Sequence, residues 1–508
     1  MAVRSELLIC VALLLTSAAT ASRDFHNREA PIPSQCYTRT ESHFNPCYTC
    51  HQSYPADARH TNQQRDGFQQ GSYAFSDIGV TNHWTNLFVD RTEAIERISN
   101  RAIDRYVAQD NYAAFQADAP TQPWVLDNLA AGPDAFDAGG LARDGSRWVA
   151  FNYKPLPSTF WPTNGSAGDV MIRLPAKYST LEGKFSRDVY FANLALLELA
   201  ILDLEATTVT ATDEQRVGVD LDGDGSIGVT KLVKRQPNWV GDAAHEPIPH
   251  MLYPQGTEFL HTVRYLTPKG TGATRMKEVR YMYKQAFLPL ARLKSVYYAE
   301  AKEKHYGELP VLIDRGEQGV SNRMGWILHG FIEDERGYLR RQTSEEMFFC
   351  TGCHKAVGTT IDNSFAFPRK IPGALGWRYI DLEAMADLPN RGETRGEYET
   401  YLERVGGGDE FRQNREMLQR WFRADGTVDI AKVGRLTSIA ELIQPSPKRA
   451  RLLNKAYVAV VHEQSFVKGR DTTISPATNV FESIDREVPP LPPDRHFHWD
   501  IRLEADPF

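Results

Sequence analysis

CYTCH at residues 47–51 and CTGCH at residues 350–354 are the two stretches that most constrain the fold of this chain. The Cys-x-x-Cys-His spacing is typical of covalent haem attachment. Two thiols on one turn can each add to a haem vinyl group, and the histidine that follows can reach the iron as its proximal ligand. The pair therefore predicts two covalently bound haem groups. A large flat apolar group at each motif also allows loops where another fold would need helices.

Each residue of the two motifs has a predicted role. The thioether anchors are Cys47, Cys50, Cys350 and Cys353, and the proximal iron ligands are His51 and His354. The alternatives are a chance match or half of a zinc site. Zinc requires four ligands, and no second cysteine pair lies near either motif to complete such a site.

The N-terminus has the pattern of a secretory signal. Arg4 precedes a short apolar run, Leu7 to Leu15, and Ala19-Thr20-Ala21 fits a cleavage site. We therefore expect a periplasmic or secreted protein, cleaved near Ala21. Cys10 lies inside the apolar run with further apolar sequence after it, which disfavours lipid attachment there.

Cys36 is the one mature cysteine outside the motifs. It is either a free thiol or, because it lies close to the first motif, a distal thiolate ligand to a haem.

Charge and hydropathy limit the classes of partner. The formal charge of −7 does not favour nucleic acid as a partner. No later stretch approaches the roughly 20 apolar residues of a membrane helix, so we expect no transmembrane segment in the mature chain. The expected partner is a redox protein or a small-molecule electron donor or acceptor.

The hydrophobic pattern predicts a mainly α fold with substantial irregular structure and a minor β component, and two haem-binding regions. Helices are expected at residues 90–116, 194–204, 277–306 and, after the second motif, at 381–387, 396–405, 409–423, 436–444 and 446–463. Strands are expected within 216–265 and at 326–333. Residues 343–346 form a capping box that opens the helix carrying the second motif. The predicted regions are 1–21 (signal peptide), 22–190 (first haem), 191–310 (middle region with an acidic loop), 311–487 (second haem) and 488–508 (a Pro-rich tail).

The acidic loop has the sequence DLDGDGSI at residues 220–227, which matches the first eight positions of an EF-hand. Lys231 occupies the twelfth position, where a bidentate Glu is expected. The candidates for calcium ligands are Asp220, Asp222, Asp224 and Ser226, completed from elsewhere in the chain. The alternative is an acidic turn without a metal ion.

The sixth ligand of each iron decides the function. The candidates for distal ligands are His83, His261 and His329, with His60 as a further candidate near the first motif. His261 shares a predicted strand face with Phe259 and Val263. Near the second motif, Met385 and Met417 are at workable sequence distances, although helix core is the commoner role for Met417.

The two motifs resemble those of dihaem c-type cytochromes, a group that spans several folds and includes electron carriers, peroxidases, dehydrogenases and rubber oxygenases. The resemblance covers only the motifs and their flanks, and the spacing of about three hundred residues departs from the peroxidases. It implies one-electron transfer by an exported protein. The alternative is a haem oxidoreductase, with one haem as active site and the other as electron relay. No catalytic residues can be named from the sequence.

Overall fold

The computed structural model describes residues 25–39, 49–51, 75–118, 125–157, 162–311, 313–355, 357, 359–406, 414–484, 492–495 and 500–504. The predicted signal segment, Cys47 and His60 lie outside these residues. None of the helices in these ranges is long and apolar enough to cross a membrane.

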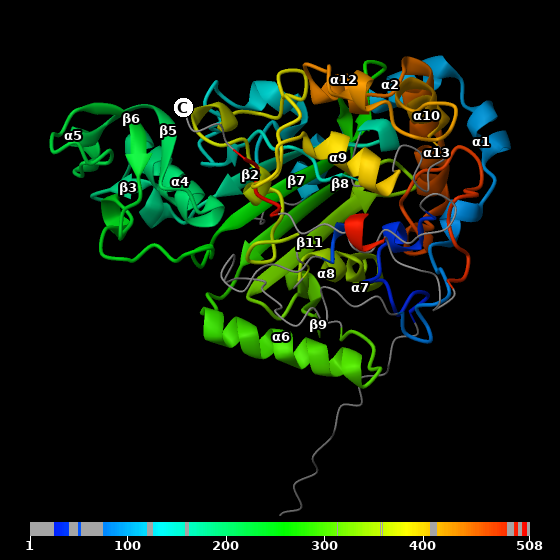
Figure 1. The fold of residues 1–508 in the computed structure, drawn as a ribbon, viewed down its shortest axis with the longest axis horizontal. Helices are drawn as coiled ribbons and strands as arrows, with labels where there is room; N and C mark the ends of the chain where they lie inside the picture. The colour runs from blue at the N-terminus through cyan, green and yellow to red at the C-terminus, as the bar shows by residue number, and fades with distance from the viewer. Residues whose placement is uncertain are drawn as a thin grey trace, which may run out of the picture.

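An antiparallel sheet lies at the centre of the described chain (Figure 1). It has eight strands in the order β1-β2-β7-β8-β11-β10-β9, and β12 also pairs with β11. The strands are β1 Val149–Ala150, β2 Ala167–Arg173, β7 Glu258–Leu266, β8 Gly272–Lys284, β9 Ile313–Asp314, β10 Val320–Ser321, β11 Trp326–Glu333 and β12 Leu339–Arg341. The expectation of a mainly α fold with a minor β component is therefore wrong.

Strand β8 explains most of that error. Residues 277–306 were expected to be helical, but β8 runs to Lys284 and helix α6 begins only at Leu290. Most side chains of β8 are buried on both faces of the sheet. A strand covered on both sides lacks a clean alternation of polar and apolar residues, so its period of two is hidden. The expected strand at 326–333 is confirmed as β11.

The expected helices at 396–405 and 446–463 are confirmed as α9 and α13, α4 begins earlier than expected, and other predictions were too long. The expected helix at 90–116 is three helices, with Ser99 capping the second. Residues 381–387 form turns and no helix. The helices are α1 Thr92–Arg97, α2 Asn100–Val107, α3 Tyr112–Asp118, α4 Arg187–Leu202, α5 Glu214–Val217, α6 Leu290–His305, α7 Ser344–Phe348, α8 Cys350–Cys353, α9 Glu397–Val405, α10 Arg415–Trp421, α11 Ile430–Val433, α12 Ile439–Ile443 and α13 Pro447–Glu463.

Helices and a small lobe surround the sheet (Figure 1). Helix α13 begins at the N-cap Ser446 and packs on β7, where the Asn454 side chain pairs with both backbone groups of Leu266. Helices α1 and α2 pack against α13. The buried helix α4 packs on the hairpin of β5 (Ala206–Asp213) and β6 (Val229–Lys234), and with α5 and the short strands β3 (Thr180–Leu181) and β4 (Lys184–Phe185) it forms the lobe.

The sheet draws its strands from three of the predicted regions. Strands β1 and β2 come from residues 22–190, β7 and β8 from 191–310, and the remaining four from 311–487. Segments far apart in sequence thus meet on one sheet.

Candidate functional site

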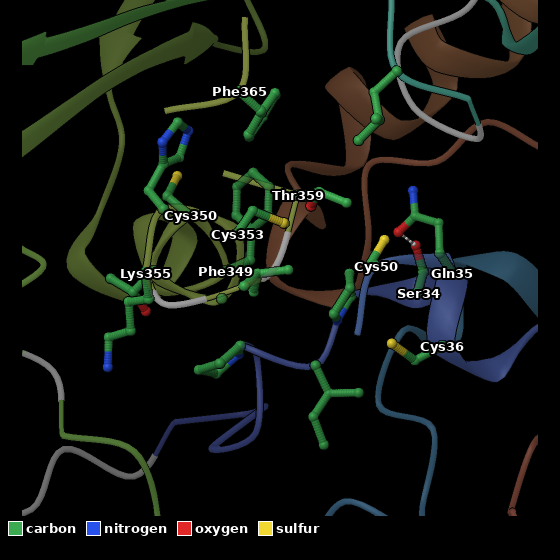
Figure 2. Close-up of a pocket in the computed structure, with 18 of the residues that line it drawn as sticks. Ser34, Gln35, Cys36, Cys50, Phe349, Cys350, Cys353, Lys355, Thr359 and Phe365 are labelled. Atoms are coloured by element: carbon green, nitrogen blue, oxygen red, sulfur yellow. Dashed lines mark hydrogen bonds between the residues drawn. The ribbon is translucent and has the colours of Figure 1, made fainter. Parts of the chain in front are cut away.

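The described residues of the two Cys-x-x-Cys-His motifs open onto one cavity of about 1100 Å³. Its lining includes Cys50 and His51 from the first motif and residues 350–354 from the second. In Figure 2 the Cys50 and Cys353 side chains, from segments about three hundred residues apart, extend into the same space. A single-ligand pocket usually measures about 300–1,000 Å³. The cavity is therefore large enough for more than an ordinary small ligand.

The second motif sits on a well-defined helical start. The Thr343 side chain accepts a hydrogen bond from the Glu346 backbone amide, and the Glu346 carboxylate accepts one from the Thr343 amide. The predicted capping box is thus confirmed. Helix α7 ends at Phe348, and α8 carries Cys350 and Cys353 on one turn.

Four thiols lie close together at the cavity. Burial, with a smaller contribution from Cys36, raises the pKa of Cys50 to about 11. Burial also raises the pKa of Cys353 to about 12, with contributions from Cys50, Cys36 and Cys350. The four described cysteines therefore lie near one another, and burial raises the pKa of Cys50, Cys350 and Cys353. Cys36 belongs to this cluster although it lies outside both motifs.

His354 is oriented for ligation. Burial lowers its pKa to about 4, so the imidazole is neutral. Its Nδ1 lies 2.9 Å from the backbone oxygen of Asn363 and must donate to it, which leaves the lone pair on Nε2. The ring stacks on Phe365 at 5.1 Å between centroids. A backbone carbonyl on the second nitrogen is the usual support of a metal-bound histidine.

One face of the central sheet forms a wall of the cavity. The lining residues on this face are Val170, Phe259, His261, Val263, Glu278, Arg280, Met282 and Leu328. They alternate along β2, β7, β8 and β11, and the strand register brings them together on one side. The wall is mostly apolar; its polar side chains are His261, Glu278 and Arg280.

His261 presents its ring to this cavity. Its Nδ1 lies 2.6 Å from the Asp169 backbone oxygen, and burial lowers its pKa to about 4. A neutral ring that donates through Nδ1 carries its lone pair on Nε2, as His354 does. A Cβ at Gly168 would lie 2.6 Å from the His261 Cε1, so glycine leaves room for this ring.

His329 is placed differently. It pairs with Tyr281 across β8 and β11, whereas His261 pairs with Arg280. Because residues 280 and 281 are neighbours in one strand, the two histidines point to opposite faces of the sheet. The His329 ring lies 5.6 Å from that of Tyr281, and burial lowers its pKa to about 4. His329 also lines the cavity, but from the sheet face opposite to that of His261.

His83 is outside the lining of the cavity. Its ring lies edge-on to that of His26, with 5.9 Å between centroids. Among the predicted distal ligands, the geometry therefore favours His261. His305, at the end of α6, also lines the cavity, and no sequence pattern singled it out. Met385 and Met417 are both buried in a separate helical core.

A positively charged group lies beside the second motif. Glu278 lies 2.8 Å from Arg280 and 3.0 Å from Arg470, and both guanidinium groups face the Phe349 ring. Burial would raise the pKa of Glu278, but the two arginines outweigh it and lower the value to about 2. Two cations and one carboxylate leave a net positive charge at the cavity wall. Such a wall suits the carboxylate groups of a ligand.

The acidic loop lies in the lobe, away from this cavity. The ligand atoms of Glu214, Asp220 and Asp222 lie within 4.8 Å of one another. Asp224 and Ser226, also predicted as ligands, are not part of this group. Glu214 comes from α5, outside the loop, where its carboxylate accepts the amides of Leu221 and Gly228 at 2.6 and 2.9 Å. The sequence motif gave no sign of it.

Comparison with known proteins gives a family. A family model described as a "-like lipoprotein" matches residues 137–438. An uncharacterized lipoprotein of Aquifex aeolicus is 31% identical over 539 residues, which cover 91% of this chain and 90% of the relative. No solved structure matches.

These matches correct the family suggested by the motifs. Neither match is described as a cytochrome, and together they cover most of the chain rather than two pentapeptides. Membership of the dihaem c-type cytochromes is therefore wrong as a family assignment. The chain belongs to a family of lipoproteins, exported and associated with the cell envelope.

Proposed function

We propose that this protein carries two covalently attached haems in the shared cavity and transfers single electrons to or from a redox partner. The observation that carries the proposal is the convergence of two Cys-x-x-Cys-His motifs on one cavity. If the two Cys-x-x-Cys-His sequences were chance occurrences, there would be no reason for them to line the same cavity.

The donor set supports haem at the second motif. Cys350 and Cys353 are on one turn, and His354 has its Nδ1 engaged by a backbone carbonyl. Arg280 and Arg470 supply the positive charge that haem carboxylates would need. Once bound, haem supplies an iron centre that gains and loses one electron.

The chain itself contributes orientation and exclusion of water. The apolar sheet face around Phe259 and Met282 covers one side of the cavity. His354 and His261 are held as neutral imidazoles by burial and by their backbone acceptors. A dry wall with fixed polar groups limits the reorganisation that accompanies a change of charge.

The alternative is a haem oxidoreductase (a peroxidase, oxygenase or dehydrogenase) with one haem as active site and the other as relay. One observation favours it. Of the predicted distal histidines, His261 lines the cavity from the sheet face of Arg280, His329 lines it from the opposite face, and His83 is outside the lining. Unequal axial ligation is what such an enzyme needs.

The test is the intact mass of the protein, produced in a host that exports it and attaches haem outside the cytoplasm. We expect the mass of a chain that begins at Ser22 plus two haem groups, retained after acidic organic extraction. The C350A/C353A variant is expected to lose one haem. The matched control C36A removes a thiol of the same cluster but outside the motifs, and is expected to retain two.

A chain of unmodified mass would contradict the proposal, as would equal haem loss in C36A and C350A/C353A. The same intact mass also shows at which residue the mature chain begins. A start at Ser22 agrees with a periplasmic or secreted protein, whereas a lipid-modified Cys10 would place the mature chain on a membrane.

For the acidic loop we propose a structural calcium ion. The grouping of Glu214 with Asp220 and Asp222 supports it, because a carboxylate from outside the loop replaces the one missing at position 231. The ion would join α5 to the loop between β5 and β6.

A further inference from the structure

A tight turn after the second motif holds the carbonyl that orients His354. Ile361 and Ser364 pair through two backbone hydrogen bonds of 2.9 and 3.0 Å. Between them, Asp362 and Asn363 both have positive φ, at 46° and 65°. This is the backbone of a type I′ turn, which Asn and Asp tolerate better than most residues. The Asn363 carbonyl accepts the hydrogen bond from the His354 Nδ1.

The turn is anchored from the other side of the fold. The Asp362 carboxylate accepts hydrogen bonds from the Lys284 ammonium group and, at 2.8 Å, from the Tyr253 amide. Lys284 is the last residue of β8, and both members of the ion pair are 0% exposed. The central sheet, which forms the cavity wall, is thereby tied to the turn.

Stability alone does not account for this arrangement. A fully buried ion pair costs desolvation energy, and apolar residues of similar volume often serve stability as well or better. The Asn363 side-chain oxygen is buried with no hydrogen-bond partner. Two successive non-glycine residues at positive φ add strain. These costs fall on the turn whose Asn363 carbonyl contacts His354.

We infer that the Lys284–Asp362 ion pair is a positioning pair: it fixes the Ile361–Ser364 turn so that the Asn363 carbonyl sets the orientation and donor strength of His354. The inference rests on the proposed function, since it concerns haem bound at residues 350–354. Neither Lys284 nor Asp362 touches that site directly. A weaker hydrogen bond at Nδ1 makes the imidazole a poorer electron donor, which favours reduced iron.

The first test compares two double variants by redox titration of the haem-loaded protein. K284M/D362N replaces the ion pair with two uncharged side chains. The asparagine introduced at position 362 still offers an oxygen that accepts the hydrogen bond from the Tyr253 amide. Its matched control, K370M/E198Q, makes the same kind of change at another fully buried Lys–carboxylate pair that does not line the cavity. We expect one of the two midpoint potentials to rise in K284M/D362N while the other stays. We expect K370M/E198Q to match the parent.

A second comparison decides the matter if K284M/D362N does not fold. N363A and N363G both lose the side-chain hydrogen bonds to the Lys355 oxygen and the Met324 sulfur. Only alanine is strained at a φ of 65°. We expect the potential to rise more in N363A than in N363G.

Unchanged potentials in folded K284M/D362N, or equal potentials in N363A and N363G, would overturn the inference while leaving the proposed function standing. A shift as large in K370M/E198Q would overturn it too. A parent protein without haem at residues 350–354 would overturn the proposed function, and this inference with it.

Discussion

Single residues around the cavity show what a sequence can and cannot reveal about a ligand. Both His261 and His329 lie in apolar strands and looked alike in the sequence. Their faces were not distinguishable, because β11 is buried almost throughout and shows no polar side. Only the register with β8, where they oppose Arg280 and Tyr281, separates them. The motif residues needed no such context, since their roles follow from local spacing.

This difference predicts unequal effects of two matched substitutions. H261L is expected to convert one haem from low spin to high spin, so that about half of the low-spin signal is lost. H329L removes another partly buried imidazole, from the opposite face of the sheet, and is expected to leave the signal unchanged. Electron paramagnetic resonance of the oxidised protein measures both.

The opposite pattern, with H329L altering the spectrum and H261L silent, would contradict the assignment of the two faces. A parent protein that already contains one high-spin haem would favour the oxidoreductase over the carrier.

Elements were predictable where a local signal fixed them. The capping box at Thr343 and the helix expected at 446–463 both rest on short segments, and both are confirmed, the helix as α13. Strand β8 was not predictable, because burial on both faces removes its alternation. The acidic loop is an intermediate case. Its turn could be read from the sequence, but Glu214 belongs to another element and reaches the loop only through the fold.

The loop gives a prediction at this scale. Calcium is expected to raise the thermal unfolding temperature, with a stabilisation of about 2.7 kcal/mol at 100 times the dissociation constant. D222N is expected to abolish most of this rise. D224N is the matched control: each aspartate accepts one amide two residues further on, at 3.1 and 2.7 Å, but Asp224 lies outside the carboxylate group. Calorimetry with and without a chelator measures the effect, and equal responses of the two variants would contradict the site.

At the scale of the whole molecule, the sheet brings distant segments together. Strands from three predicted regions form one surface, and residues 49–51 and 350–354 of the two motifs open onto the same cavity beside it. Sequence separation carries no information about this proximity, so whether the motifs would meet could not be predicted. The family assignment also failed at this scale, because two pentapeptides say little about the rest of a chain of 508 residues.

The central claim is that both motifs hold haem in one cavity. The most direct measurement is the anomalous scattering of iron in crystals of the exported protein. The account predicts two iron peaks inside the cavity, one next to the Nε2 of His354 and one next to His51. No iron at either histidine, or a second iron outside the cavity, would contradict it.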